Sequence, residues 1–145
     1  MLKRNKKNEY KNNLVNGGNL NNSDLFKTPI DINEILSEVI SMIGVLSVDI
    51  LDWNGKVLYS YYRWGKSDNI LEEKELFSLI KGIRKQLNKI NQGNLKHIII
   101  RSDDLNIVVY SSEKITLIIH CDLKIKLALL TIRAQRATKV ISDLL

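Results

Sequence analysis

The chain is predicted to fold as an α+β domain, in which one five-stranded antiparallel sheet carries helices on both faces. Three observations predict this class. Three separated segments carry apolar residues at helical spacing, five short segments between them are rich in β-branched and aromatic residues, and the connections within each group of strands are short. The order along the chain is helix, two strands, helix, three strands and helix, which gives three layers.

The charge is unevenly distributed along the 145 residues. Residues 1–29 hold six Lys or Arg against two Asp or Glu, which is +4 of the chain's net +6, together with eight Asn. Such a segment buries too little apolar surface to offset the entropy of ordering. We therefore expect a disordered basic tail at residues 1–29 and one domain at residues 30–145. The tail is either solvated or a basic arm that contacts an anionic membrane, and no nucleic-acid partner is expected because no aromatic platform accompanies it.

The cellular setting is predicted from three absences in the sequence. The single cysteine, Cys121, cannot form an intramolecular disulfide. No apolar run approaches the ~20 residues of a membrane-spanning helix, and the N-terminal region lacks the apolar block of a secretory signal. A cytoplasmic protein is expected, with peripheral membrane contact through the tail as the further possibility.

The first helix is predicted over residues 32–43. Asp31 and Glu34 fit a capping box at its start, and Gly44 suits the left-handed conformation that ends a helix. Between them, apolar residues repeat at steps of three and four and form one wide face: Ile32, Ile35, Leu36, Val39, Ile40 and Ile43.

A hairpin is predicted next, with strands over residues 45–51 and 56–63. The turn sequence Asp52-Trp53-Asn54-Gly55 ends in the Asn-Gly pair that is typical of tight hairpins. The second strand is only partly apolar and is expected at an edge of the sheet. Trp53 and Trp64 either cover an end of the core or anchor a partner.

A polar linker at residues 66–69 leads to a second helix, predicted over residues 71–91. Its apolar stripe faces the sheet and comprises Leu76, Ile80, Ile83, Leu87 and Ile90. Beside that stripe, Ser78 and Gly82 lie four residues apart, flanked by Leu79 and Gln86. A glycine inside a helix costs about 1 kcal/mol against alanine. Either a second helix approaches closely here, or the glycine is tolerated on an exposed face.

Three strands are predicted over residues 96–101, 105–111 and 115–121, and their short connections predict an antiparallel meander. Their apolar runs are unbroken, which predicts cover on both faces of the sheet. The last helix is predicted over residues 123–144. Its main apolar stripe comprises Leu127, Leu130, Ala134, Ala137, Ile141 and Leu144, and a neighbouring face carries Ile125, Leu129 and Ile132. This wide face either packs on the first helix or is partly offered to a partner.

Residues 44–58 resemble the Roadblock/dynein light chain family, whose domains open with a glycine, an apolar strand, an Asp-x-x-Gly turn and a second strand. Residues 134–145 are similar to the family's closing helix, which is rich in Arg and Ala. With the order of elements, the resemblance covers about four-fifths of the chain. Longin and profilin-like domains have related topologies, but a longin domain normally begins with its strands, whereas a helix comes first here.

The resemblance implies a dimer, with itself or another Roadblock-like chain, in which the third strands pair edge to edge and the second helices lie side by side. The implied interface comprises Ser78, Leu79, Gly82, Gln86, His97, Ile99 and Arg101. Platforms of this kind in relatives bind small Ras-like GTPases, so we expect a scaffold that binds such a GTPase, with modulation of GTP hydrolysis left open.

The expected partner-binding residues are cations on the outward face of the second helix and the two tryptophans: Lys81, Arg84, Lys85, Lys89, Trp53 and Trp64. A solvated charged face is the alternative. The alternative function is a longin-like or profilin-like trafficking or cytoskeletal adaptor, with membrane contact through residues 1–29.

No enzyme activity, metal or cofactor is expected. His120 and Asp122 share one face of a strand while Cys121 points to the other, so His120 and Cys121 form no nucleophile–base pair. His97 and His120 lack neighbouring ligands at metal spacing. The sequence also contains neither a Gly-Lys-Ser/Thr phosphate loop nor a dinucleotide fingerprint.

Overall fold

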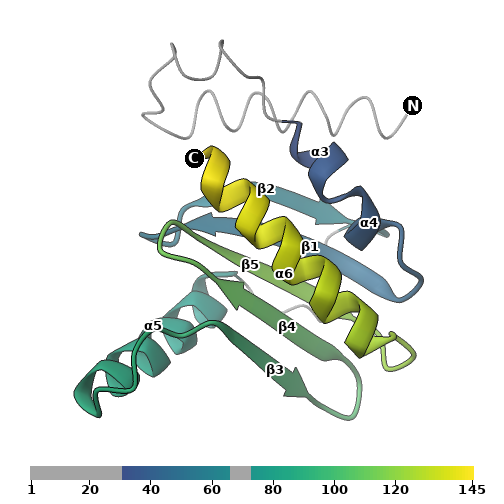
Figure 1. Ribbon diagram of the computed structural model, residues 1–145. Helices are drawn as coiled ribbons and strands as arrows, with labels where there is room; N and C mark the ends of the chain where they lie inside the picture. The colour runs from purple at the N-terminus through teal and green to yellow at the C-terminus, as the bar shows by residue number, and fades with distance from the viewer. Residues whose placement is uncertain (1–30, 66–72) are drawn as a thin grey trace.

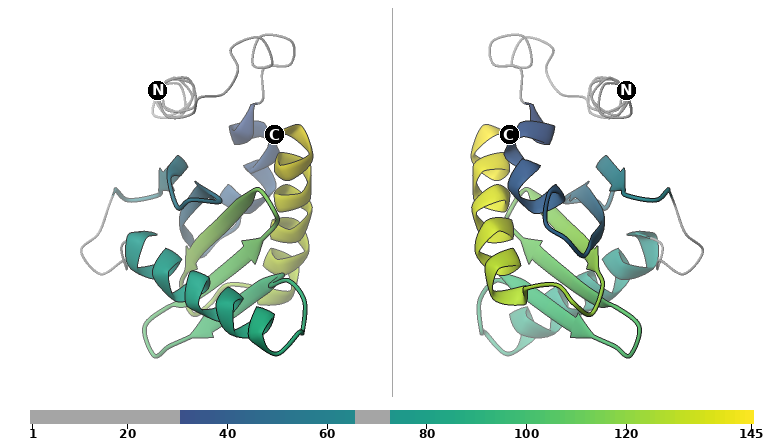
Figure 2. Two further views of the ribbon diagram at one scale, coloured as in Figure 1. Left: turned by 90° about the vertical axis from the view of Figure 1, so that its left-hand side faces the viewer. Right: turned by 90° about the vertical axis from the view of Figure 1, so that its right-hand side faces the viewer.

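The computed structural model describes residues 31–65 and 73–145, in which five strands form one antiparallel sheet in the order β2-β1-β5-β4-β3. The helices are α3 (Ile32–Ile35), α4 (Ser37–Ile40), α5 (Glu73–Lys89) and α6 (Leu127–Leu144), and the strands are β1 (Val45–Asp52), β2 (Val57–Tyr62), β3 (His97–Arg101), β4 (Asn106–Ser111) and β5 (Ile115–Cys121). Helices α3, α4 and α6 cover one face of the sheet and α5 covers the other (Figures 1 and 2). The predicted α+β class with helices on both faces is confirmed.

Some of the predictions fall on residues outside the described ranges. They are the basic tail at residues 1–29, the linker at 66–69 and the predicted start of the second helix at residue 71. The domain boundary at residue 30 therefore stays a prediction. Within the described residues, no helix is both long and apolar enough to cross a membrane.

The first predicted helix is divided into α3 and α4 at Leu36. Asp31 accepts a hydrogen bond from the backbone N–H of Glu34 at 3.4 Å, as the capping box predicts. The Ser37 hydroxyl then donates to the carbonyl of Glu34 at 2.7 Å, and this local bond competes with the helical ladder. The prediction that Ile43 belongs to the apolar face is wrong. Its side chain is 90% exposed because α4 ends at Ile40 and the chain turns at Gly44, which has φ +101°.

The turn between β1 and β2 is stabilised by hydrogen bonds that the Asp52 side chain accepts. Its carboxylate accepts hydrogen bonds from the backbone N–H groups of Asn54 at 2.8 Å and Lys56 at 2.9 Å. Gly55 follows with φ +87°, and only this residue of the turn needs the left-handed region. β2 lies at one edge of the sheet, as predicted.

The Arg63 side chain, just after the end of β2, forms hydrogen bonds with the chain segment that leads into β1. Its Nε donates to the carbonyl of Val45 at 2.7 Å, and its Nη2 donates to the carbonyls of Ile40 and Met42. The two Nη2 bonds give acceptors at and just after the end of α4 a side-chain donor, where the helical ladder has ended.

Apolar residues pack in two clusters, one on each face of the sheet. The larger lies between the sheet and helices α3, α4 and α6, and the smaller lies between the sheet and α5. β4 and β5 are buried almost throughout, which confirms the predicted cover on both faces of these two strands. β3 instead alternates between exposed and half-buried residues, because α6 packs on β4 and β5 and leaves the edge strand uncovered on that face.

Helix α6 begins at Leu127, later than the predicted residue 123. Asp122 accepts a hydrogen bond from the N–H of Lys124 at 2.9 Å, so the chain first makes a turn. Most of the predicted main stripe is buried against the sheet, α3 and α4, although Leu144 is exposed. Of the neighbouring face, Ile125 is buried, whereas Leu129 and Ile132 are exposed.

A partly buried polar cluster lies between the N-terminal end of α5 and the sheet. The Ser60 hydroxyl donates to the fully buried carboxylate of Asp49 at 2.6 Å. The Tyr62 hydroxyl lies within hydrogen-bond distance of the carboxylates of both Asp49 and Glu73, and burial raises the pKa of Tyr62 well above its usual range. Glu73 is the first residue of α5, so these contacts anchor the helix where it begins.

Ser47 and His120 form a second buried polar pair. The Ser47 hydroxyl lies 3.0 Å from His120 Nδ1, and both side chains are fully buried. Burial lowers the pKa of His120 to about 4, so the ring is neutral near pH 7.

Replacing Gly55 with alanine is expected to destabilise the fold by about 2 to 4 kcal/mol. A non-glycine residue at this φ costs about 1 to 2 kcal/mol, and the new Cβ would stand 2.6 Å from the Phe77 ring, which must then shift. Gly93, at φ +82°, is the matched control because its Cβ would meet nothing within 4 Å. Urea unfolding of G55A and G93A should show the larger loss in G55A, and equal losses would contradict the packing of α5 on this turn.

His120 should make the fold less stable as the pH falls from 6.5 to 4. Over this range the unfolded state binds a proton at residue 120 and the folded state does not, so acid favours unfolding by up to about 3 kcal/mol. In the H120Q variant, the free energy of unfolding should therefore fall less steeply between pH 6.5 and pH 4 than in the wild type. Parallel pH profiles for the two proteins would show that His120 is not buried in its neutral form.

Candidate interaction surface

Helix α5 presents three distinct surfaces outside its contact with the sheet. Its outermost ridge carries three exposed lysines at four-residue steps, Lys81, Lys85 and Lys89, as the sequence predicted. None of the three forms an ion pair within the described residues. The ridge separates a shallow groove on one flank of the helix from a deeper cleft on the other.

The shallow groove brings together the helix residues that were predicted for a dimer interface. It is lined by Glu75, Ser78, Leu79, Gly82, Ile83, Gln86, Leu87 and Ile90. Leu79 is 50% exposed and Ile90 is 60% exposed, although Ile90 was predicted to face the sheet. A Cβ added to Gly82 would meet nothing within 4 Å, so the surface above this glycine is open to a neighbouring backbone.

β3 is the second open edge of the sheet. Its ladder with β4 pairs His97 with Tyr110 and Arg101 with Asn106, and it is flanked by the bonds Ser111 N–H to Lys96 O and Ser102 N–H to Leu105 O. In an antiparallel pair, hydrogen-bonded and non-bonded residue pairs alternate. The backbone N–H and C=O groups of His97, Ile99 and Arg101 therefore point away from β4, toward the open edge.

The side chains of His97, Ile99 and Arg101 lie on the face of the sheet that α6 covers elsewhere. The His97 ring stacks on Tyr110 with ring centroids 5.2 Å apart, and Ile99 is 40% exposed. The predicted interface thus divides into two parts on opposite faces of the sheet, with the α5 groove on one and these three side chains on the other.

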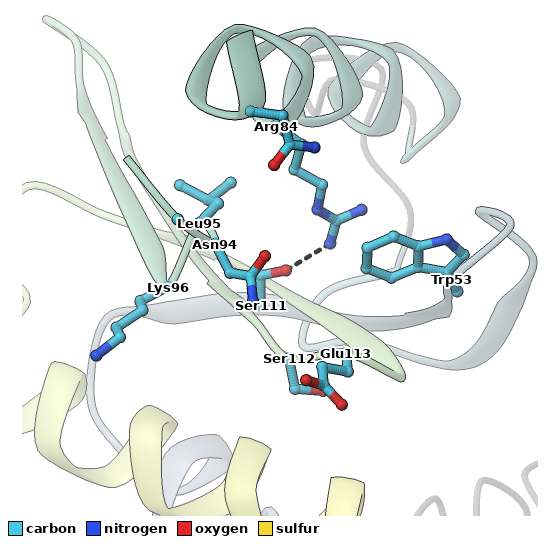
Figure 3. A pocket seen from close by; sticks show the side chains of 10 residues that line it. Trp53, Arg84, Asn94, Leu95, Lys96, Ser111, Ser112 and Glu113 are labelled. Carbon is cyan, nitrogen blue, oxygen red and sulfur yellow. Dashed lines mark hydrogen bonds between the residues drawn. The ribbon is translucent and has the colours of Figure 1, made fainter. Parts of the chain in front are cut away.

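Arg84 does not lie on the outward face of α5, so the prediction that it belongs to that face is wrong. Its Nη2 donates to the hydroxyls of Ser111 and of Thr116, the latter at 2.8 Å, and its guanidinium carbon lies 4.4 Å from the centroid of the Trp53 ring. Figure 3 shows the side chain reaching from α5 toward β4, with Trp53 beside it. Burial lowers the pKa of Arg84.

Arg84, Trp53 and Ser111 line a cleft of about 400 Å³ between α5 and two hairpin turns. Its walls come from the β1–β2 turn (Trp53), α5 (Arg84, Asn88), the connection to β3 (Gly93, Asn94, Leu95, Lys96), the end of β4 (Ser111) and the β4–β5 turn (Ser112, Glu113). Neither tryptophan belongs to a buried cluster. Trp53 is 53% exposed at the mouth of the cleft, whereas Trp64 is 83% exposed and lines neither the cleft nor the groove.

The candidate catalytic side chains are separated or buried. Asp122 lies beyond the end of β5 in the turn before α6, whereas His120 faces Ser47 in the interior. Burial raises the pKa of Cys121 to about 12, which leaves its thiol protonated and unreactive. The described ranges hold no group of three or more His, Cys, Asp or Glu side chains that could bind a metal ion.

Comparisons with known proteins identify the fold. No family model and no curated protein matches the chain. A solved structure described as MglB with tetrameric arrangement has 15% identity and a TM-score of 0.68, over 78% of this chain and 86% of that one. Myxococcus xanthus MglB gives 15% identity and a TM-score of 0.62, over 77% and 92%. A Roadblock/LC7 domain from Streptomyces avermitilis gives 16% and 0.57, over 74% and 92%. The chain therefore has a Roadblock-like fold, as its sequence resemblance predicted.

Proposed function

We propose that this Roadblock-like chain is a non-enzymatic dimeric scaffold that binds a small Ras-like GTPase. The observation that carries the proposal is the surface formed by the open edge of β3 and the groove of α5. Both parts present apolar side chains and open backbone to solvent, and both lie where the family resemblance implies the dimer interface.

Edge-to-edge pairing of two β3 strands would pair the open backbone groups of this edge and bring the two α5 helices together. It would give partners to the outward backbone groups of His97, Ile99 and Arg101, which make an exposed edge prone to association. A two-fold axis at this edge would place β3 of one copy against β3 of the other, so that both copies use the same surface. It would also bring the two α5 helices together on one face, where Gly82 permits close approach. One structure of the same fold is described as tetrameric, which supports self-association of this chain.

The lysine ridge of α5 is the surface that we assign to the GTPase. In a dimer joined at β3, two ridges would lie on the same face and form one cationic platform. Clustered cations of this kind accelerate association with an acidic surface and orient it. The family resemblance supplies the class of partner, and the effect on GTP hydrolysis is a separate question that binding alone does not answer.

Substituting Ile99 with lysine should convert the dimer to a monomer. A lysine on an open edge strand opposes pairing, because the pairing would bring two like charges close together. Ile132→Lys is the matched control, since Ile132 is also an exposed isoleucine but lies on α6. Sedimentation velocity should give a dimer for the wild type and I132K and a monomer for I99K. A wild type that is monomeric across the micromolar range would contradict dimerisation.

Reversing two lysines of the ridge should weaken GTPase binding by roughly tenfold or more, since an exposed ion pair contributes up to about 1 kcal/mol and each reversed charge would also repel an acidic partner surface. The GTPase is first identified by capture from host lysate with the full chain, in parallel with GDP and with a non-hydrolysable GTP analogue. Its affinity is then measured for the wild type and for K81E/K85E.

The matched control is K124E/K139E, which makes the same change in net charge at two exposed lysines outside α5. Binding that depends on the nucleotide, is weakened in K81E/K85E and is retained in the control supports the platform. Equal affinity of the two double variants would remove the ridge from the binding site, and the absence of any GTPase in both captures would contradict the function.

A further inference from the structure

Arg84 is a half-buried cation whose hydrogen-bonding capacity is only partly used. Its Nη2 donates to Ser111 and Thr116, and its Nε and Nη1 make no hydrogen bond within the described residues. No carboxylate of the described chain lies within ion-pair distance of it. A desolvated guanidinium without a counter-charge is costly, and a planar guanidinium is well suited to bind a carboxylate.

The orientation of Arg84 is fixed before any ligand arrives. Two hydroxyl acceptors hold Nη2, and the Trp53 ring lies against the guanidinium at 4.4 Å. A side chain held in this way loses less conformational freedom on binding than a free surface arginine does. Lys96 adds a second positive charge to the lining, against one acidic residue, Glu113.

The shape of the cleft favours a peptide segment over an enclosed small molecule. Its volume is at the small end of the range for ligand pockets, which is roughly 300 to 1,000 Å³. Most of its lining residues are exposed, so a ligand would be covered on one side only. The Trp53 ring lies against the guanidinium, and Leu95 adds further apolar surface to the lining. Tryptophan and arginine are among the residue types most enriched at the centres of protein interfaces.

We propose that the cleft between α5 and the β1–β2 and β4–β5 turns binds an acidic side chain of a protein partner, with Arg84 as the carboxylate receptor and Trp53 as the apolar contact beside it. The cleft lies on the opposite flank of α5 from the groove that we assign to self-association. Dimer formation therefore leaves it open, and the two sites are testable separately.

The test uses the full chain with Trp64→Phe, which leaves Trp53 as the only tryptophan. Tryptophan fluorescence is followed while a capped tripeptide with glutamate between two leucines is added, and the titration is repeated with the glutamine counterpart and with inorganic phosphate. We expect saturable binding of the glutamate peptide and at least tenfold weaker binding of the glutamine peptide. Equal binding of the two peptides, or saturation by phosphate at lower concentration, would overturn the proposal.

Two variants assign the binding to the cleft. R84Q should abolish the response, whereas K124Q, which removes an exposed cation outside α5 and the cleft, should bind as the wild type does. Because Arg84 also links α5 to β4 and β5, a second variant leaves it in place. Asn88→Asp introduces a carboxylate one helical turn from Arg84 in the same cleft, and it should weaken the glutamate peptide at least fivefold by competition. Unchanged affinity in N88D would contradict the role of Arg84.

Discussion

The open edge of β3 is the feature on which the proposed self-association of this molecule depends. β3 hydrogen-bonds to β4 through alternate residues only, and α6 lies over β4 and β5 without covering the edge strand. The same three residues, His97, Ile99 and Arg101, therefore expose both their backbone groups and their side chains. An edge of this kind is normally protected by charge, bulges or a partner. Its terminal residues are polar, but Ile99 at its centre is not, and a second copy of the chain is the partner that we propose for this edge.

Helix α5 divides the opposite face of the sheet into surfaces of different chemistry. Its buried side rests on the sheet through Leu76 and Ile80, and its N-terminal end is held by Glu73 in the polar cluster with Tyr62. With the helix fixed in this way, the periodicity of 3.6 residues per turn directs small and apolar residues to one flank, lysines to the ridge and Arg84 to the other flank. The self-association, the GTPase binding and the acidic-peptide binding that we propose therefore involve separate surfaces of one helix.

Sequence patterns were sufficient to predict the fold class, the order of the described elements and the two strands of the β1–β2 hairpin. They were not sufficient where a specific side-chain contact decides the outcome. The direction of Arg84 depends on Trp53, Ser111 and Thr116, which are distant in sequence. The unbroken apolar run of β3 predicted cover on both faces because a sequence does not reveal how far α6 extends across the sheet.

Residue-resolved amide hydrogen exchange of β3 tests most directly whether its open edge pairs with a second copy. The N–H groups of His97, Ile99 and Arg101 point away from β4, so nothing in the described chain protects them, whereas those of Ile98 and Ile100 face β4. Pairing predicts that the first three exchange slowly at high protein concentration and faster on dilution. Rapid exchange of these three amides at every concentration, with Ile98 and Ile100 still protected, would contradict it.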